Sequence, residues 1–333
     1  MPVVSIRHLT RYRYRRPVGF GEHRMMFRPH ESHDQRVLSS HLAISPAPTR
    51  LRHVEDVFGN CLSVASFGER SCELVFESRV RIEHRPLPPF ADRDGECHAP
   101  AKTSRFAYEP DEMPDLRRSM ERDHPDTKGE VARWARRFGG RVGPASLPDL
   151  LTEMTQFIHA DFTYQSRLEA GTRTPRETLS LGSGSCRDFA VLMMEAARSL
   201  GFAARFVSGY LYDEKLVQSG APMKGGGATH AWCAIYLPGA GWVEYDPTNG
   251  LIAGRNLIRV CMAREPHQAL PLSGGYLGRR EDFSSMTVRV EVAVGDPPTP
   301  GLRPSEAGRK VLTPVPDPEE AVAPEAVPEP VVS

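Results

Sequence analysis

The segment GSGSCRDFAVLMMEAARSLGF, residues 182–202, places a cysteine where a helix is expected to begin. Ser185 and Asp188 have the S-x-x-D spacing of a capping box, which predicts that Cys186 is the first helical residue. Gly201 is free to adopt the left-handed conformation that ends a helix, and Phe202 can fold back on the last turn. One face of this helix carries an apolar stripe at helical spacing, formed by Phe189, Leu192, Met193, Ala196, Ala197 and Leu200.

A sulfur at the first helical position lies beside unsatisfied N–H groups and the positive end of the helix dipole. Both favour the thiolate of Cys186 over the thiol. The alternative is that Cys186 is a small core hydrophobe, the commonest fate of an unpaired cysteine. The choice between them depends on whether a base lies nearby.

Two strand-like runs joined by a Pro/Gly turn follow downstream, THAWCAIYL at 229–237 and GWVEYD at 241–246. This pattern is typical of an antiparallel hairpin. If Tyr236 pairs with Ala240, His230 lies directly opposite Asp246, and a register slip of two residues still leaves both on one face. A thiol, an imidazole that can accept its proton and a carboxylate that can orient the imidazole therefore occur in the order Cys186, His230, Asp246.

These motifs, together with Phe162-Thr163-Tyr164 and Val207-Ser208-Gly209-Tyr210, strongly resemble the transglutaminase-like superfamily of papain-like cysteine enzymes. Within it, the chain is similar to bacterial transglutaminase-like proteins that carry an extra N-terminal β domain. The resemblance covers about residues 147–294 for the core and 3–85 for the β domain. It implies that Cys186 is the nucleophile, His230 the general base and Asp246 the residue that orients His230.

The predicted fold class is α+β: a papain-like transglutaminase core, in which the Cys186 helix packs on an antiparallel sheet, preceded by a small β-sandwich. We expect a β domain at residues 1–90, an irregular and partly helical connector at 91–145, a catalytic domain at 146–294 and a disordered Pro-rich tail at 295–333.

Alternation of apolar and polar residues predicts the strands of the β domain, and helical periodicity predicts the helices that follow. The expected strands are 4–14, 37–44, 51–56, 61–67 and 74–84, and the expected helices are 116–121, 128–138 and 147–159. Residues 165–181 are expected to form a polar loop before the cysteine. Val288, Val290, Val292 and Val294 alternate with polar neighbours, which predicts a strand that closes the catalytic domain.

Three aromatic residues are candidates for substrate binding. Trp232 and Trp242 share the face of His230 and Asp246 in the expected hairpin, so they are placed to wall the acyl site. Tyr164 is placed to line the site with its hydroxyl. For all three the alternative is ordinary core packing, which is favoured for Trp242.

The composition excludes several classes of function. The 333 residues include 42 basic and 42 acidic ones, so the formal net charge is zero and we expect neither nucleic acid nor a membrane as a partner. The N-terminus has no basic-then-apolar signal pattern and no apolar run approaches about 18 residues, so the expected location is the cytoplasm.

No cofactor and no metal are expected. The six cysteines form no C-x-x-C pair, which argues against both a zinc site and a disulfide framework. The glycines at 225–227 lack the G-K-[ST] ending of a phosphate-binding loop and are interpreted as a mobile loop beside the site. No acidic loop supports calcium binding.

The sequence therefore predicts an enzyme that cleaves or transfers an amide acyl group through an acyl-thioester on Cys186. The substrate is expected to be a protein or peptide, attacked at a glutamine side chain, a peptide bond or an isopeptide bond. A cysteine peptidase and a true cross-linking transglutaminase both remain open. A rival class is a binding or scaffold module that keeps the fold without its chemistry. The oligomeric state is not determined.

We expect Cys186 to be the most reactive of the six thiols, because it alone combines a helix N-terminus with a partner imidazole. Limited labelling with iodoacetamide at neutral pH, quantified by peptide mass spectrometry, measures the relative rates. Faster labelling of Cys61 or Cys261 would contradict the assignment of the nucleophile.

Overall fold

The structure is a computed structural model that describes residues 3–85, 106–138, 147–167, 171–212, 228–252, 254 and 256–295. The expected tail after Gly295 and the loop with the three glycines at 225–227 lie outside these described residues. Among the residues that the structure describes, no helix combines the length and the apolar content that a membrane span requires.

The N-terminal β domain consists of two antiparallel sheets that enclose an apolar core. The first has the order β15-β1-β6-β3, with β16 also paired to β1, and the second has the order β14-β2-β5-β4. The strands contributed by the N-terminal half are β1 (Val3–Phe20), β2 (His23–Met25), β3 (Gln35–Ser45), β4 (Arg50–Glu55), β5 (Cys61–Ser66) and β6 (Ser71–His84). The alternation expected in β1 is confirmed from Ile6 onward, where Ile6, His8 and Thr10 are buried and Arg7 is half-exposed, but Ser5, expected to face outward, is buried as well.

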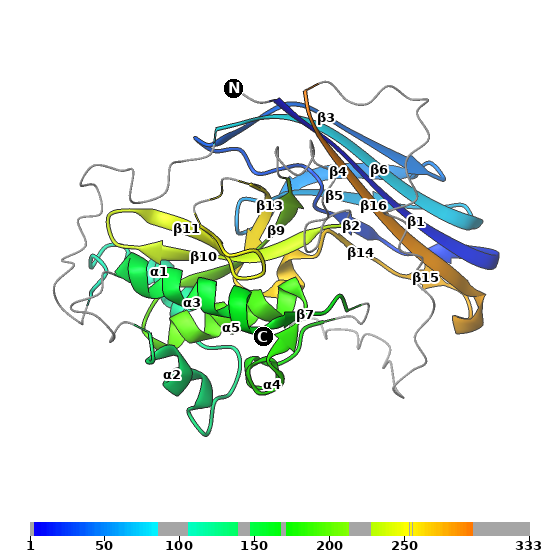
Figure 1. Cartoon of the computed structure of the whole chain (residues 1–333). Helices are drawn as coiled ribbons and strands as arrows, with labels where there is room; N and C mark the ends of the chain where they lie inside the picture. Colours follow the sequence, from blue (N-terminus) through cyan, green and yellow to red (C-terminus); the bar gives the residue numbers. More distant parts are fainter. Residues whose placement is uncertain are drawn as a thin grey trace, which may run out of the picture.

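The C-terminal strands differ from the sequence-based expectation. Residues 288–294 were assigned to the catalytic domain, but β16 (Phe283–Val294) pairs with β1 over its length, from Val4 opposite Val294 to Tyr14 opposite Phe283. Figure 1 shows orange β16 running beside dark blue β1. The short strands β14 (Leu272–Ser273) and β15 (Tyr276–Leu277) also join the N-terminal sheets. Alternation identified the strand, but it carries no information about the sheet to which the strand belongs.

The region expected to hold the catalytic residues, named the catalytic region for that expectation, contains a second five-stranded antiparallel sheet, the catalytic sheet, with helices on one face (Figure 1). Its order is β12-β11-β10-β9-β13. The strands are β9 (Ala204–Leu211), β10 (His230–Leu237), β11 (Gly241–Asp246), β12 (Leu251–Ile252) and β13 (Leu257–Ala263). The helices are α1 (Met113–Met120), α2 (Glu130–Ala135), α3 (Leu147–Asp161), α4 (Pro175–Leu181) and α5 (Cys186–Ser199), and β7 (Thr163–Tyr164) pairs in parallel with β8 (Ser183–Gly184).

Helix α5 begins and ends as its sequence predicts. Ser185 is the N-cap, and its side chain and that of Asp188 form the reciprocal hydrogen bonds of a capping box. At the other end Gly201 has a φ of 94°, and the N–H of Phe202 donates to the carbonyl of Ala197 at 3.1 Å. That bond and the positive φ form a Schellman motif, which stops the helix and turns the chain into β9.

Helix α4 corrects the expectation of a polar loop at 165–181. Thr174 caps α4 through a capping box with Glu177, and Pro175 occupies the first turn, where a missing N–H costs nothing. The signal T-P-R-E was present in the sequence. It was missed because no apolar run follows it.

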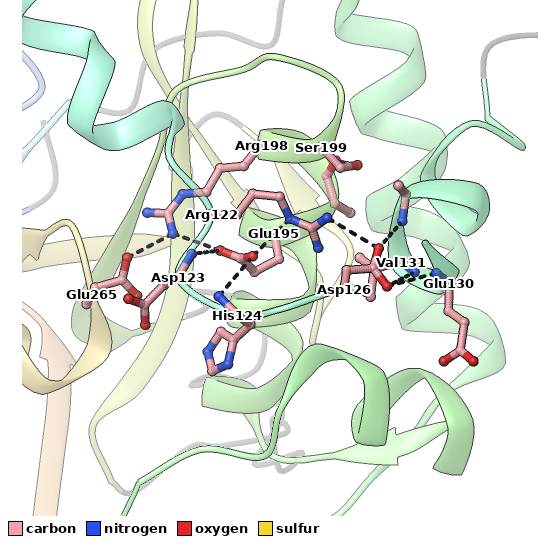
Figure 2. Close-up of polar contacts among 12 residues, drawn as sticks. Arg122, Asp123, His124, Asp126, Glu130, Val131, Glu195, Arg198, Ser199 and Glu265 are labelled. Atoms are coloured by element: carbon pink, nitrogen blue, oxygen red, sulfur yellow. Dashed lines mark hydrogen bonds and ion pairs between the residues drawn. The ribbon is translucent and has the colours of Figure 1, made fainter. Parts of the chain in front are cut away.

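The second half of α5 is held by a network of buried charges. Figure 2 shows Arg198 between Glu195 and Glu265, to which its Nη1 donates at 2.9 and 2.8 Å. Glu195 also accepts from the backbone N–H of Asp123 and from the side chain of Arg122. Because every carboxylate here has a donor, the helix can be buried on all sides and still carry charge.

The two regions share one continuous apolar core. Val4, Ile6, Val80 and Ile82 of the N-terminal sheet belong to the same hydrophobic cluster as the buried face of α5. The N-terminal β domain is therefore packed onto the catalytic sheet and is not a separate module.

Truncations at two nearby positions test the assignment of β16. A chain ending at Gly295 is expected to keep the melting temperature of the full chain, since it retains all the strands described above for the two sheets of the β domain and for the catalytic sheet. A chain ending at Asp282 lacks β16, leaves one side of β1 unpaired and is expected to melt several degrees lower. Thermal unfolding monitored by circular dichroism makes the comparison. Equal melting temperatures for the two truncations would contradict the importance of the β16 pairing.

Candidate active site

Cys186 is the first residue of α5 and is nearly buried, with 9% of its surface exposed. Its sulfur lies where the first-turn N–H groups of the helix have no intrahelical acceptor. Asp188, one turn into the helix, is fully buried and accepts hydrogen bonds from the N–H and the hydroxyl of Ser185 at 2.8 and 2.9 Å. The position of the thiol therefore depends on the cap that precedes it.

The same Asp188 carboxylate organises the loop before the helix. It accepts from the backbone N–H of Arg173 at 2.7 Å and from Nη1 of Arg167 at 3.1 Å. Arg173 in turn donates to the carbonyl of Ser183. Gly184 makes this close packing possible, because a Cβ there would lie 2.9 Å from the Cβ of Asp188.

The hairpin that carries His230 and Asp246 has a register two residues away from the expected one. Cys233 pairs with Tyr245 and Leu237 with Gly241, so the position opposite His230 is Thr248. Asp246 lies diagonally across the sheet from His230. A two-residue shift keeps both side chains on the same face, and for this reason the pair still forms.

His230 and Asp246 form a fully buried pair. Nε2 of His230 lies 2.8 Å from Oδ2 of Asp246, and both side chains are inaccessible to solvent. The other ring nitrogen, Nδ1, is buried and makes no hydrogen bond to a polar group within the described residues. Nδ1 is therefore the ring atom available to the thiol of Cys186.

The electrostatics of the pair favour an imidazolium. Burial acts to lower the pKa of His230, but Asp246 and then Cys186 outweigh it and raise the pKa to about 10. Burial acts to raise the pKa of Asp246, but His230, Asn249 and the N–H of Thr248 hold it below its ordinary value.

Asn249 is a site residue that the sequence analysis missed. Its Nδ2 donates to Oδ2 of Asp246 at 2.9 Å and lies 3.4 Å from Nε2 of His230. The N–H of Thr248 donates to Oδ1 of Asp246 at 2.9 Å, so both carboxylate oxygens are satisfied. The segment D-P-T-N-G is a turn in which an Asp is expected to accept from the chain two residues on, and this was the available signal.

Helix α3 holds this turn in place. Nδ1 of His159 donates to the carbonyl of Thr248 at 2.9 Å. Gln156 donates to the carbonyl of Gly250 at 2.8 Å. Gly250 has a φ of 68°, which a side chain would disfavour. The carboxylate that orients the base is thus fixed from outside its own strand.

Tyr164, expected to bind substrate, lies on the strand that pairs with the residues leading into Cys186. Its strand β7 pairs with β8 just before the cysteine, with Tyr164 opposite Gly184. Burial, with further effects of Cys186 and Asp246, raises the pKa of its hydroxyl to about 12. The hydroxyl therefore stays protonated at neutral pH and is able to donate a hydrogen bond.

The two tryptophans lie in different places. The ring of Trp232 is fully buried and stacks on His230, with centroids 5.9 Å apart and planes inclined by 28°. Trp242 pairs with Tyr236 near the turn of the hairpin and lies under the guanidinium of Arg205, 4.2 Å from its ring centroid. Six residues of strand separate Tyr236 from His230, a distance of roughly 20 Å, so this location favours the core-packing alternative for Trp242.

The described residues contain no group of three or more His, Cys, Asp or Glu side chains arranged to hold a metal ion.

Two family models match parts of this chain. Residues 4–83 match the bacterial transglutaminase-like N-terminal region, and residues 133–247 match the transglutaminase-like superfamily. The chain therefore carries a transglutaminase-like core. The matched core includes Cys186, His230 and Asp246, and the matched N-terminal region is the β domain described above.

The similarity to two relatives and to one solved structure covers most of this chain. An uncharacterized protein of Mycobacterium tuberculosis (strain ATCC 25618 / H37Rv) is 29% identical over 278 residues, which cover 81% of this chain and 86% of that protein. An uncharacterized protein of Mycobacterium leprae (strain TN) is 28% identical over 285 residues, covering 82% and 92%. The solved structure of a candidate cysteine protease from Cytophaga hutchinsonii superposes with a TM-score of 0.62 at 17% identity, covering 94% of this chain and 97% of that one. This similarity shows a shared fold.

The stability that the His230–Asp246 pair contributes should depend on pH. The pKa of His230 is raised from 6.5 to about 10, so its contribution is fully present below 6.5 and is lost as the pH rises through about 10. The pKa of Asp246 is lowered from 3.8, so its contribution is lost as the pH falls below that value. We therefore expect the difference in unfolding free energy between the wild type and Asp246→Asn to be largest at about pH 4 to 6.5 and to shrink toward about pH 10.

Urea unfolding of both proteins across this range measures the difference, and the exposed Asp111→Asn serves as a matched control that should show no such trend. A difference that is constant with pH would contradict the ion pair.

Proposed function

We propose that this chain is a cysteine-dependent enzyme that cleaves or transfers the acyl group of an amide in a protein or peptide, at a glutamine side chain, a peptide bond or an isopeptide bond. One observation carries the proposal: Nε2 of His230 is held by Asp246, which leaves Nδ1 for a thiol at the start of α5. A binding module has no need of a buried charged pair that raises the pKa of an imidazole.

The first half of the reaction forms a covalent intermediate. The thiolate of Cys186 attacks the amide carbonyl carbon, and the resulting oxyanion is stabilised by the backbone N–H of Cys186 at the helix N-terminus. We assign the protonated hydroxyl of Tyr164 as a second donor. The C–N bond then breaks, the leaving amine takes a proton from the imidazolium of His230, and an acyl-thioester remains on Cys186.

The second half regenerates the enzyme. Neutral His230 removes a proton from the acceptor, which attacks the thioester carbonyl and releases the acyl group, while Cys186 leaves as the thiolate. Throughout the cycle Asp246 keeps the imidazole in one orientation and balances its charge. Asn249 keeps Asp246 in place.

We expect water to be the main acceptor. Transfer to an amine requires a site that excludes water, because water intercepts a thioester that is open to solvent. Trp242, one of the residues that would have walled the acyl site, lies at the far end of the hairpin. Hydrolysis or deamidation should therefore exceed amine transfer.

A competition experiment tests both the chemistry and the acceptor. The enzyme is incubated with glutamine-containing peptide libraries and a millimolar primary amine, and acid and amide products are quantified by mass spectrometry. We expect acid in excess with the wild type, no product with Cys186→Ala, and wild-type turnover with Cys72→Ala, a matched loss of an exposed thiol. Excess amide would indicate a true transglutaminase. Equal turnover by Cys186→Ala would refute the proposed nucleophile.

A further inference from the structure

A buried arginine joins the two regions of the molecule close to the active site. Arg259 lies on β13 of the catalytic sheet, and its side chain is 11% exposed. Its guanidinium binds Asp34 of the N-terminal domain in a bidentate manner, at 2.7 and 3.2 Å, and donates to the hydroxyl of Ser32 at 2.6 Å. Gln35 also bonds to the backbone N–H and carbonyl of Arg259. Arg259 is therefore held in place by the segment between β2 and β3 and the start of β3.

The same guanidinium reaches the strand that carries Asp246. Nη1 of Arg259 donates to Oε1 of Glu244 at 2.6 Å, and Glu244 lies two residues before Asp246 on β11. Burial raises the pKa of Glu244, while Arg259 and then Trp232 oppose this rise. A buried carboxylate without its cation is strongly destabilised, so the position of Glu244 depends on Arg259.

Glu244 in turn lies against the residue that packs on the catalytic imidazole. Glu244 pairs with Ala234 of β10, and Trp232 lies two residues before Ala234 on the same face, so Glu244 and Trp232 are diagonal neighbours across the two strands. Trp232 is also among the groups that oppose the rise in the pKa of Glu244. The Trp232 ring stacks on His230. Gly209 lies beneath it, where a Cβ would come within 2.7 Å of the ring. Trp232 therefore has little freedom to move without moving His230.

We propose that Arg259 and Glu244 are positioning residues, which couple the docking of the N-terminal β domain, through Trp232, to the orientation of His230. This inference rests on the proposed function of the Cys186–His230 pair. In this arrangement the β domain contributes to the geometry of the site, because Asp34 and Ser32 bind the guanidinium of Arg259, and the same guanidinium binds Glu244. The side-chain hydrogen bonds of Arg259 and Glu244 include neither Cys186 nor His230, so both act through other residues.

The same interface contains a natural control. Nδ1 of His8 on β1 lies 2.9 Å from the hydroxyl of Tyr210 on β9, which is a buried hydrogen bond between the same two regions. The described contacts of this bond do not include Trp232 or Glu244. Tyr210→Phe therefore removes one buried hydrogen bond between the two regions and leaves every contact of Arg259, Glu244 and Trp232 in place.

The test follows the reactivity of Cys186, which requires no substrate. The rate of alkylation by iodoacetamide is measured by peptide mass spectrometry from about pH 5 to 9 for the wild type, Arg259→Met, Arg259→Lys and Tyr210→Phe. We expect Arg259→Met to slow alkylation near pH 6 by about tenfold and to shift the profile to higher pH, because the thiolate loses a correctly oriented imidazolium. Arg259→Lys should be intermediate, since it keeps the charge without the bidentate geometry. Tyr210→Phe should lower the melting temperature but keep the wild-type profile.

A lower melting temperature for Arg259→Met with an unchanged pH profile would overturn the proposal and reduce Arg259 to a structural ion pair. If Arg259→Met does not fold, Trp232→Phe provides the same measurement, because it keeps a ring against His230 and removes the indole N–H that faces Glu244. A wild-type profile for Trp232→Phe would also overturn the proposal. A failure of amide turnover in the wild type would refute the proposed function alone, since alkylation reports the coupling without it.

Discussion

A buried carboxylate at the start of helix α5 is the constraint on which the rest of the site depends. Asp188 is inaccessible to solvent, so its charge has to be satisfied from within the protein. The donors come from Ser185, from the backbone at Arg173 and from the side chain of Arg167. Satisfying one charge thus folds the loop before the helix and sets the direction in which Cys186 enters it. The thiol of Cys186 is placed by an electrostatic requirement two residues away from it.

The base is placed by a second requirement of the same kind. Asp246 is buried, and its oxygens are satisfied by His230, Asn249 and the N–H of Thr248. The turn that supplies two of these donors is anchored by helix α3, which has no catalytic group of its own in this arrangement. Cys186 and His230 therefore lie on two elements that are stabilised separately, helix α5 and the hairpin of β10 and β11. The two residues are brought together because α5 packs against the sheet that contains this hairpin. Loss of either buried carboxylate partner would leave an uncompensated charge, and the geometry of the site would be lost with it.

The N-terminal β domain and the catalytic region are held together by more than their shared apolar core. Strand β16 brings the described C-terminal part of the chain back to β1, so the N-terminal sheet contains strands from before and after the catalytic sheet in the chain. Arg259, Asp34 and Glu244 add a buried polar connection at the same junction. An arrangement in which the first and last strands pair makes independent folding of the β domain unfavourable, because β1 would lose one of its two partners. The domain boundary expected at residue 294 is accordingly replaced by a discontinuous β domain.

The sequence by itself determined the local features: the capping box at Ser185, the Schellman end at Gly201, the apolar stripe of α5, the alternation of β1 and the identity of the Cys186, His230 and Asp246 candidates. The caps, the stripe and the alternation each depend on residues close together in the chain, so their local energies are visible in the order of residues. The three candidates were found from the expected hairpin and from the family resemblance. Only the tertiary structure decided the two-residue shift of the hairpin, the sheet that β16 joins, and the contacts of Trp232 and Arg259. These depend on which surfaces remain unpaired after the other elements have packed, and a strand pattern with period two is compatible with several partners and with any even shift of register.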